Sequence, residues 1–119
     1  MLRPVSIRAR AASAIIYAVY ALQFVGIPKK FITDHFASPA PDALHVFLAR
    51  GAGVAIAFTA YAMYKFDVPV QLIVAYNILV GLVYPWNAAF ISKLDVKYPM
   101  HRVPEILMAA LAVAGLLAL

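Results

Sequence analysis

The sequence predicts an all-α polytopic membrane protein, a single antiparallel bundle of four transmembrane helices within residues 1–119. Two observations lead to this fold class. The chain is 66% hydrophobic, whereas soluble domains are roughly 45–50% apolar. Its apolar residues also fall into four long runs, each bounded by charges or prolines. A soluble domain of this size buries only about two-thirds of its unfolded surface, so we expect the excess apolar surface to face lipid.

The first predicted helix covers about residues 11–27, between Arg10 and a Pro28-Lys29-Lys30 segment. Its length reaches the lower bound of the ~17–25 residues that a spanning helix needs. The flank MLRPVSIRAR is basic and free of acidic residues, which is typical of a secretory n-region or an organellar import segment. The apolar run is too long for a signal peptide and no small-x-small cleavage site follows. We therefore expect a retained span in an organellar membrane, either the thylakoid or the mitochondrial inner membrane.

The other predicted helices cover about residues 43–64, 68–91 and 103–119. Ser38 or Asp42 is the candidate N-cap for the second helix, and the tight turn at 65–67 makes the second and third helices antiparallel neighbours. In the third helix, Pro85 predicts a kink or an early helix end, because proline cannot donate a backbone hydrogen bond. No run alternates apolar and polar residues with the period of a strand.

The net charge of +5 comes from basic residues at the edges of the apolar runs. This placement predicts contacts with lipid headgroups, and the candidates are Lys29, Lys30, Lys93 and Arg102. No basic stripe alternates with aromatic residues in a polar segment, so we expect no nucleic-acid partner. Basic residues are nearly balanced between the two predicted faces, so charge does not determine the membrane orientation.

Polar residues gather toward one end of the predicted bundle, where residues 28–42 and 92–102 connect the helices. Arg50 lies roughly 10 Å inside the second helix, and an intramembrane arginine usually faces the bundle and finds a partner. Glu105 is the acid at a similar predicted depth, and Asn87 is a possible hydrogen-bond partner. We expect an Arg50–Glu105 pair, supported by Asn87, as a structural polar cluster. Ligand contact and snorkelling are the alternatives for Arg50.

His45 and Gly81 are the candidate cofactor-binding residues. His45 lies near the start of the second helix and could ligate a magnesium or iron centre axially, although a histidine at a helix end is commonly an interfacial hydrogen-bonding residue. Pro85 leaves the carbonyl of Gly81 without its helical donor, and this carbonyl could ligate magnesium. A kink, or a helix end with interfacial aromatics, is the alternative.

The sequence lacks the motifs that would indicate an enzyme or a metal protein. It contains no cysteine, which excludes disulfides, zinc–thiolate sites and iron–sulfur clusters. It also has no metalloprotease, nucleophile-elbow, phosphate-loop or EF-hand motif. The acids Asp34, Asp42, Asp67 and Asp95 lie in predicted loops or at helix ends. We therefore expect no catalytic residues and no metal site.

In its four-helix layout and basic N-terminus, the chain resembles small nuclear-encoded accessory subunits of algal or protist photosystems and of respiratory complexes. The resemblance implies a non-catalytic subunit that stabilises a larger membrane complex, foremost of the photosystem type. In a photosystem it implies chlorophyll and carotenoid contacts, with His45 and the Gly81 carbonyl as candidates. In a respiratory complex it implies lipid such as cardiolipin near Lys29, Lys30, Lys93 and Arg102.

Two further functions stay open. The small multidrug exporters resemble this chain in size, but they carry an essential acid inside the first helix, where this chain has Gln23 and no carboxylate. A membrane enzyme acting on a lipid or quinone is the other alternative, with Arg50, His45 and Glu105 lining a pocket. Proton-coupled efflux would indicate the first function, and a pocket open to lipid would indicate the second.

Overall fold

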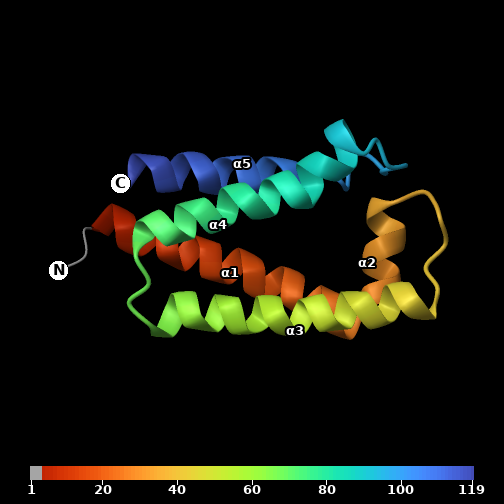
Figure 1. Ribbon diagram of the computed structural model, residues 1–119, viewed down its shortest axis with the longest axis horizontal. Coiled ribbons are helices and arrows are strands. Elements are labelled where there is room, and N and C mark those ends of the chain that lie inside the picture. The colour runs from red at the N-terminus through yellow and green to blue at the C-terminus, as the bar shows by residue number, and fades with distance from the viewer. Residues whose placement is uncertain (1–3) are drawn as a thin grey trace.

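The computed structural model describes residues 4–119, and this range is predominantly helical. The described residues form five α-helices and one short π-helix, with no strand. In chain order the elements are α1 (Pro4–Gly26), α2 (Pro28–His35), α3 (Ala43–Lys65), α4 (Val70–Val83), η1 (Asn87–Ile91) and α5 (Arg102–Leu117). Figure 1 shows α1, α3, α4 and α5 along the length of the molecule, whereas α2 lies across one end.

Three segments of the described chain are long and apolar enough to cross a membrane: Ile7–Gly26, Ala43–Lys65 and Val70–Ile91. The all-helical fold and the presence of apolar spans are therefore as the sequence predicts. The predicted fourth span at 103–119 corresponds to α5, which has 16 residues. At ~1.5 Å per residue this helix is about 24 Å long, which is shorter than the ~30 Å hydrocarbon core of a bilayer.

The helix boundaries differ from the prediction where proline intervenes. The first helix begins at Pro4 rather than near residue 11, because proline is well tolerated in a first helical turn. The predicted helix at 68–91 is interrupted at Tyr84, whose φ of −103° and ψ of −87° are not helical. Pro85 follows directly, and the chain then continues through η1. The predicted interruption at Pro85 is thus confirmed.

The helix α2 lies within residues 28–42, which the sequence analysis treated as a longer connection between helices. Pro28 occupies its first turn, and a Lys30–Asp34 pair with an Nζ–Oδ2 distance of 2.6 Å stabilises its exposed side. Phe31 and His35 form its buried side. Because this helix has only eight residues, its periodic signal is short, and the apolar runs on either side dominate the pattern.

Glycines allow the long helices to approach closely in pairs. A Cβ atom added to Gly53 of α3 would lie 2.8 Å from the Phe24 Cβ of α1, so a larger residue does not fit without a shift. A Cβ atom at Gly115 of α5 would similarly lie 2.6 Å from a methyl group of Val74 in α4. These contacts pair α1 with α3 and α4 with α5. Close backbone approach through small residues is the usual basis of helix packing in membranes.

The interior combines an apolar core with one polar link between the two helix pairs. The buried core consists of Ala14, Tyr17, Ala60, Met63, Ile73, Met108 and Leu111. The Tyr17 hydroxyl donates to Asn77 Oδ1 at 2.6 Å, and Asn77 Nδ2 donates to Ser13 Oγ at 3.1 Å. Ser13 and Asn77 are each only 1% exposed. This hydrogen-bonded triad joins α1 to α4 inside the predicted membrane region.

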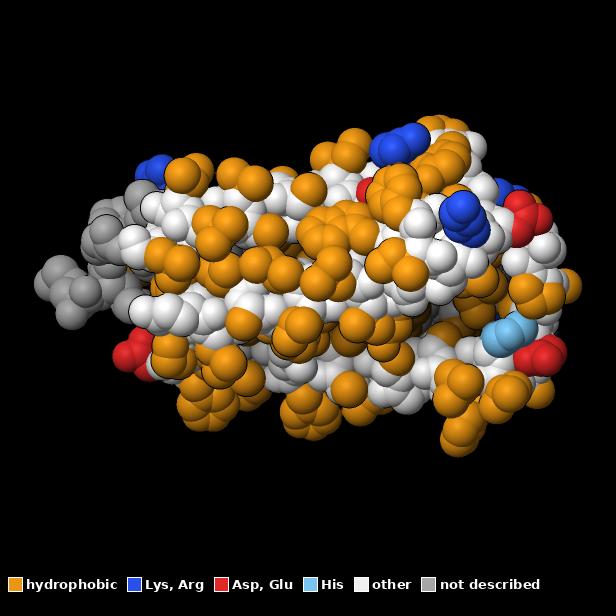
Figure 2. All heavy atoms as spheres, turned by 45° about the horizontal axis from the view of Figure 1, so that its top comes forward, with side chains coloured by type: hydrophobic (Ala, Val, Ile, Leu, Met, Phe, Trp, Pro, Cys, Tyr) orange, Lys and Arg blue, Asp and Glu red, His pale blue; other side chains and the backbone are white. Residues whose placement is uncertain are grey.

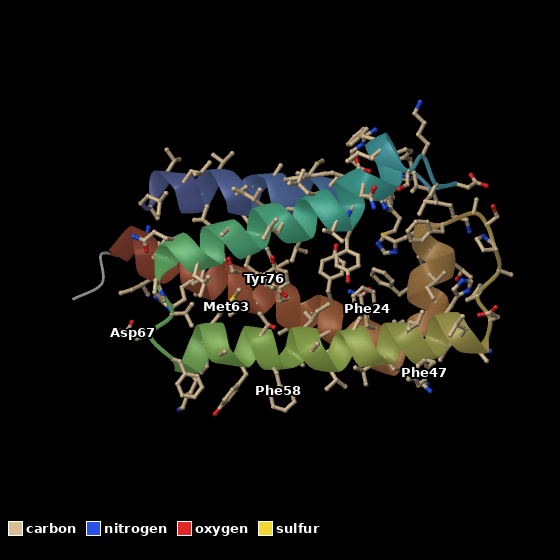
Figure 3. The ribbon with its side chains drawn as sticks, viewed as in Figure 1. Phe24, Phe47, Phe58, Met63, Asp67 and Tyr76 are labelled. Carbon is tan, nitrogen blue, oxygen red and sulfur yellow. The ribbon has the colours of Figure 1, made fainter. Side chains whose placement is uncertain are left out.

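The outer surface is apolar along the helices and charged at their ends, as Figure 2 shows. Large apolar side chains such as Phe47, Phe58 and Leu22 are more than two-thirds exposed. In Figure 3, Phe47 and Phe58 project outward from α3, whereas Met63 and Tyr76 lie between helices. Apolar surface of this extent is stable against lipid rather than water.

Candidate functional site

The polar end of the molecule is built from α2 and from the segment that links η1 to α5. The Lys97 N–H donates to the His35 carbonyl at 2.7 Å, and the Ala37 N–H donates to the Asp95 carbonyl at 2.7 Å. The Ser38 hydroxyl also donates to the Asp95 carboxylate at 2.9 Å. These bonds hold two segments that are far apart in sequence against each other, across one end of the helices (Figure 1).

Glu105 is the central acid of this end and is only 5% exposed. Its carboxylate accepts from His101 Nδ1 at 2.8 Å and from Arg102 Nη1 at 3.4 Å. Its backbone carbonyl accepts from the Trp86 indole at 3.1 Å. Because both a cation and an imidazole N–H face the carboxylate, the burial of this charge is compensated. The Trp86 bond therefore links the start of α5 to the residues that follow α4.

His35 packs beside this group from α2. Its ring stacks on Phe31 at a centroid separation of 4.1 Å, and its Nδ1 lies 2.8 Å from the Phe31 carbonyl. The His101 ring lies 6.2 Å away, centroid to centroid, at an interplanar angle of 75°. Burial, together with the nearby His101, lowers the pKa of His35 below its usual 6.5. The neutral imidazole is therefore favoured at neutral pH.

The predicted cluster of Arg50, Asn87 and Glu105 does not form. Arg50 is exposed and its Nε donates to the Val25 carbonyl of α1 at 3.3 Å. Asn87 bonds within its own segment, to the Val83 carbonyl and the Ser92 hydroxyl. The physical reason is that α3 packs on α1 rather than on α5, so that Arg50 cannot reach Glu105.

Both candidate cofactor ligands have structural contacts. His45 completes a capping box at the start of α3: Asp42 Oδ1 accepts from the His45 N–H at 2.9 Å, and His45 Nδ1 accepts from the Asp42 N–H at 3.2 Å. This role places the proton of a neutral His45 on Nε2, so the ring offers no free lone pair for a metal centre in this arrangement. Gly81 is covered by the indole of Trp86, where an added Cβ would lie 2.7 Å from the ring.

The predicted headgroup residues all lie at the polar end, on α2 or beside the link to α5. Lys29, Lys30, Lys93 and Arg102 are exposed. Lys30 is paired with Asp34, and Arg102 lies over the Tyr98 ring at 4.4 Å while it contacts Glu105. Lys93 has a φ of 51°, in the left-handed region that few non-glycine residues adopt. The contact of these four side chains with lipid headgroups stays a prediction.

The sequence analysis missed two buried polar features, a hydrogen-bonded triad and a single arginine. The first is the triad of Ser13, Tyr17 and Asn77, whose signal was a Ser–Tyr pair four residues apart on one helix face. The second is Arg10, which is 8% exposed and donates to the Phe66 carbonyl at 3.2 Å, near Asp67. Arg10 thus ties α1 to the turn between α3 and α4. It looked like an ordinary basic flank in sequence.

No protein family, curated protein or solved structure matches the chain. The fold alone therefore defines its class: an all-helical protein whose described residues include three candidate membrane-spanning helices. Over the same residues, no group of three or more His, Asp or Glu side chains is placed to hold a metal. What the site provides is a buried pair of imidazoles beside a compensated carboxylate.

Proposed function

We propose that the protein is a non-catalytic subunit that associates laterally with other membrane proteins in a larger membrane complex. The observation that carries this proposal is an apolar groove of about 620 Å³ on the outer surface of α1 and α3. Small residues form its floor and larger ones its walls, and the lining comprises Ala14, Ile15, Ala18, Ala21, Leu22, Val25, Ala57, Ala60, Tyr61 and Tyr64.

The groove has the features that a transmembrane helix of another subunit would require. Helices in a bilayer associate through close packing, because lipid tails already solvate apolar side chains, and small residues permit that close approach. The groove follows two of the candidate spans, so an occupant helix would lie within the same membrane region. Only 11% of the most apolar stretch of α3 is buried within the chain. Much of that helix is therefore available for an interface.

The polar end supports a structural rather than a catalytic role. The Trp86 indole, just after α4, donates to the backbone carbonyl of Glu105 in α5, and Ser38 and Asp95 connect the two linking segments. These contacts hold elements of the chain together. The lipid- or quinone-enzyme alternative required Arg50, His45 and Glu105 around one pocket, and these residues have separate partners. No observation favours the transporter alternative.

The proposal also includes a fourth span, an organellar membrane and a particular kind of complex. A fourth span formed by α5 is supported by its apolar sequence and by its position alongside α4 (Figure 1). An organellar membrane, thylakoid or mitochondrial inner, is supported by the basic N-terminal flank, of which residues 1–3 lie outside the described residues. Assignment to a photosystem, with chlorophyll and carotenoid, or to a respiratory complex with lipid at Lys29 and Lys93, rests on the architectural resemblance.

The test is to fill the groove. Ala18→Leu and Ala57→Leu place added bulk on two exposed groove positions, one on each helix. In native membranes solubilised with a mild detergent, we expect the tagged wild-type chain to migrate on native gels with its partners, far above its own 12.9 kDa. We expect the double variant to lose at least half of that high-mass population while its thermal stability as a free chain stays unchanged.

The matched control is Ala110→Leu, which adds the same bulk at an exposed position of α5, outside the groove. This variant should keep the high-mass species. A wild-type chain that migrates alone in the mildest detergent would contradict the proposal. If the high-mass species contained only this chain, the partner would be a second copy rather than another subunit. If the double variant kept the high-mass species, the interface would lie elsewhere than in the groove.

A further inference from the structure

The two buried histidines at the polar end form a pair that the proposed function does not use. His35 closes α2 and His101 precedes α5, and they are 4% and 3% exposed. Aromatic rings surround them: Phe31 stacks on His35, while Phe36 and Tyr98 lie edge-on to His101 at 5.4 and 6.2 Å. Both lie outside the candidate membrane-spanning segments.

The hydrogen bonds of the two rings fix the same tautomer in each. His35 Nδ1 lies 2.8 Å from a backbone carbonyl, and His101 Nδ1 lies 2.8 Å from the Glu105 carboxylate. Oxygens of these kinds only accept hydrogen bonds, so each Nδ1 must carry the proton. In the neutral form of each ring this proton is the one N–H, which leaves a lone pair on Nε2. Among the described residues, neither Nε2 has a hydrogen-bond partner.

We propose that His35 and His101 bind one late first-row transition-metal ion, of the Cu²⁺ or Zn²⁺ class, through their Nε2 atoms. Histidines that ligate metals almost always donate their other ring N–H to a carboxylate, a carbonyl or water, and these two rings are already held in that way. Imidazole is a preferred ligand for both ions. The nearby Glu105 carboxylate also offsets part of the charge of a bound cation.

The separation of the rings agrees with one shared ion. With a metal–nitrogen distance of ~2.0 Å, two imidazoles on one ion have ring centroids roughly 5–6 Å apart, depending on the angle between them. The observed 6.2 Å is at the upper end, so the rings need to approach by less than about 1 Å. Two protein ligands leave positions for water, so the site is an exchangeable one that clamps α2 to α5.

The experiment uses the full chain in detergent at pH 7.5, with an affinity tag that contains no histidine, after chelator treatment. Cu²⁺ is titrated first, since it has the higher affinity for nitrogen ligands, and Zn²⁺ is then tested by competition. We expect saturation at one equivalent, a paramagnetic resonance spectrum with coupling to two nitrogens, and a higher melting temperature with metal than without.

The decisive variants are His35→Asn and His101→Asn. The asparagine amide can replace the Nδ1–H donor, so the bonds to Phe31 and Glu105 are retained while Nε2 is removed. Each variant should bind Cu²⁺ at least tenfold more weakly and lose the metal-dependent rise in melting temperature. His45→Asn is the matched control, because the His45 ring lies in the α3 capping box. It should bind as the wild type does.

Several outcomes would overturn the inference. One is the absence of a saturable site in the wild-type chain, and another is unchanged affinity in either asparagine variant. Weakened binding in His45→Asn alone would place the ion at the cap of α3. If His101→Asn does not fold, as judged by size-exclusion and near-UV circular dichroism, His35→Asn decides the question, since α2 has no part in the α4–α5 packing. None of these results depends on whether the groove on α1 and α3 binds a partner.

Discussion

Asn77 and Ser13 are the polar side chains that the described chain buries most completely, at 1% exposure each. Both lie inside predicted spans, where an unpaired amide or hydroxyl would be costly. The Tyr17 hydroxyl completes the triad and gives α1 and α4 a specific register. This polar contact specifies which faces of the two helices meet, which the surrounding apolar contacts do less selectively.

Tyr17→Phe should therefore weaken the fold. The substitution leaves Asn77 Oδ1 without its donor, and we expect a loss of roughly 1–2 kcal/mol in the free energy of unfolding. Unfolding in mixed micelles, followed by circular dichroism, measures this loss. Tyr61→Phe removes a hydroxyl from an exposed tyrosine and serves as the control. Equal stability of the two variants would show that the triad contributes nothing specific.

Gly81 illustrates a second kind of residue-scale constraint, the close approach of a ring to a backbone. A Cβ atom at Gly81 would lie 2.7–2.9 Å from three atoms of the Trp86 indole. Gly81→Ala should displace that ring and strain its bond to the Glu105 carbonyl, at a cost of about 1–3 kcal/mol. Tryptophan fluorescence reports the displacement directly, because the chain has one Trp.

The control for this prediction is Gly51→Ala. Gly51 is also helical, but an added Cβ there meets no atom within 4 Å. Because alanine has the higher helix propensity, this variant should be neutral or slightly more stable. A fluorescence change in Gly51→Ala, or none in Gly81→Ala, would mean that packing around the indole is not the reason for glycine at position 81.

At the scale of elements, the start of α3 depends on its capping box. The Asp42 side chain accepts the His45 N–H, and this bond lowers the pKa of Asp42 below its usual 3.8. A carboxyl group with a depressed pKa contributes stability above pH 3.8, and that contribution is lost as the pH falls through the folded-state pKa. The cap is therefore fully effective at neutral pH.

Asp42→Ala should fray the first turn of α3 and lower the melting temperature at pH 7 by a few degrees. Asp42→Asn keeps an accepting oxygen and should stay close to the wild type. Thermal unfolding in detergent compares the three proteins. If Asp42→Asn lowered the melting temperature as much as Asp42→Ala does, the loss of the carboxylate charge, and not the loss of the cap, would be responsible.

How well the elements could be predicted depended on their length. The helix α3 was predicted as 43–64 and spans Ala43–Lys65, because a long apolar run between Asp42 and Lys65 has clear ends. The eight-residue α2 was not predicted. Nor could local pattern predict that Arg50 faces Val25 rather than Glu105, since this depends on which helices pair.

For the whole molecule, the side of the membrane on which the C-terminus lies decides whether α5 is a span. Figure 1 shows the start of α1 and the C-terminus at the end where α3 connects to α4, opposite α2. With α5 as a fourth span, the C-terminus faces the same compartment as the turn at Asp67. If α5 lies on one side of the membrane, the two positions face opposite compartments.

We predict that the C-terminus and Asp67 share one side of the membrane. The natural chain contains no cysteine, so single cysteines at position 67, at Lys97 and after Leu119 can each be labelled without background. In sealed vesicles, an impermeant maleimide should either label the cysteines at position 67 and after Leu119 and leave the one at Lys97 unlabelled, or do the reverse. Labelling of the C-terminal cysteine together with Lys97 would limit the chain to three spans.

The sequence by itself determined that this protein is helical, that it has spans suited to a membrane, and that proline interrupts one of them. These properties follow from composition and from the length of apolar runs, which act locally along the chain. Only the tertiary structure decided that α1 pairs with α3, that His35 meets His101, and that Ser13, Tyr17 and Asn77 share one hydrogen-bonded triad. Such contacts join residues that are distant in sequence, and the complementarity of whole helix surfaces selects them. No short segment contains that information.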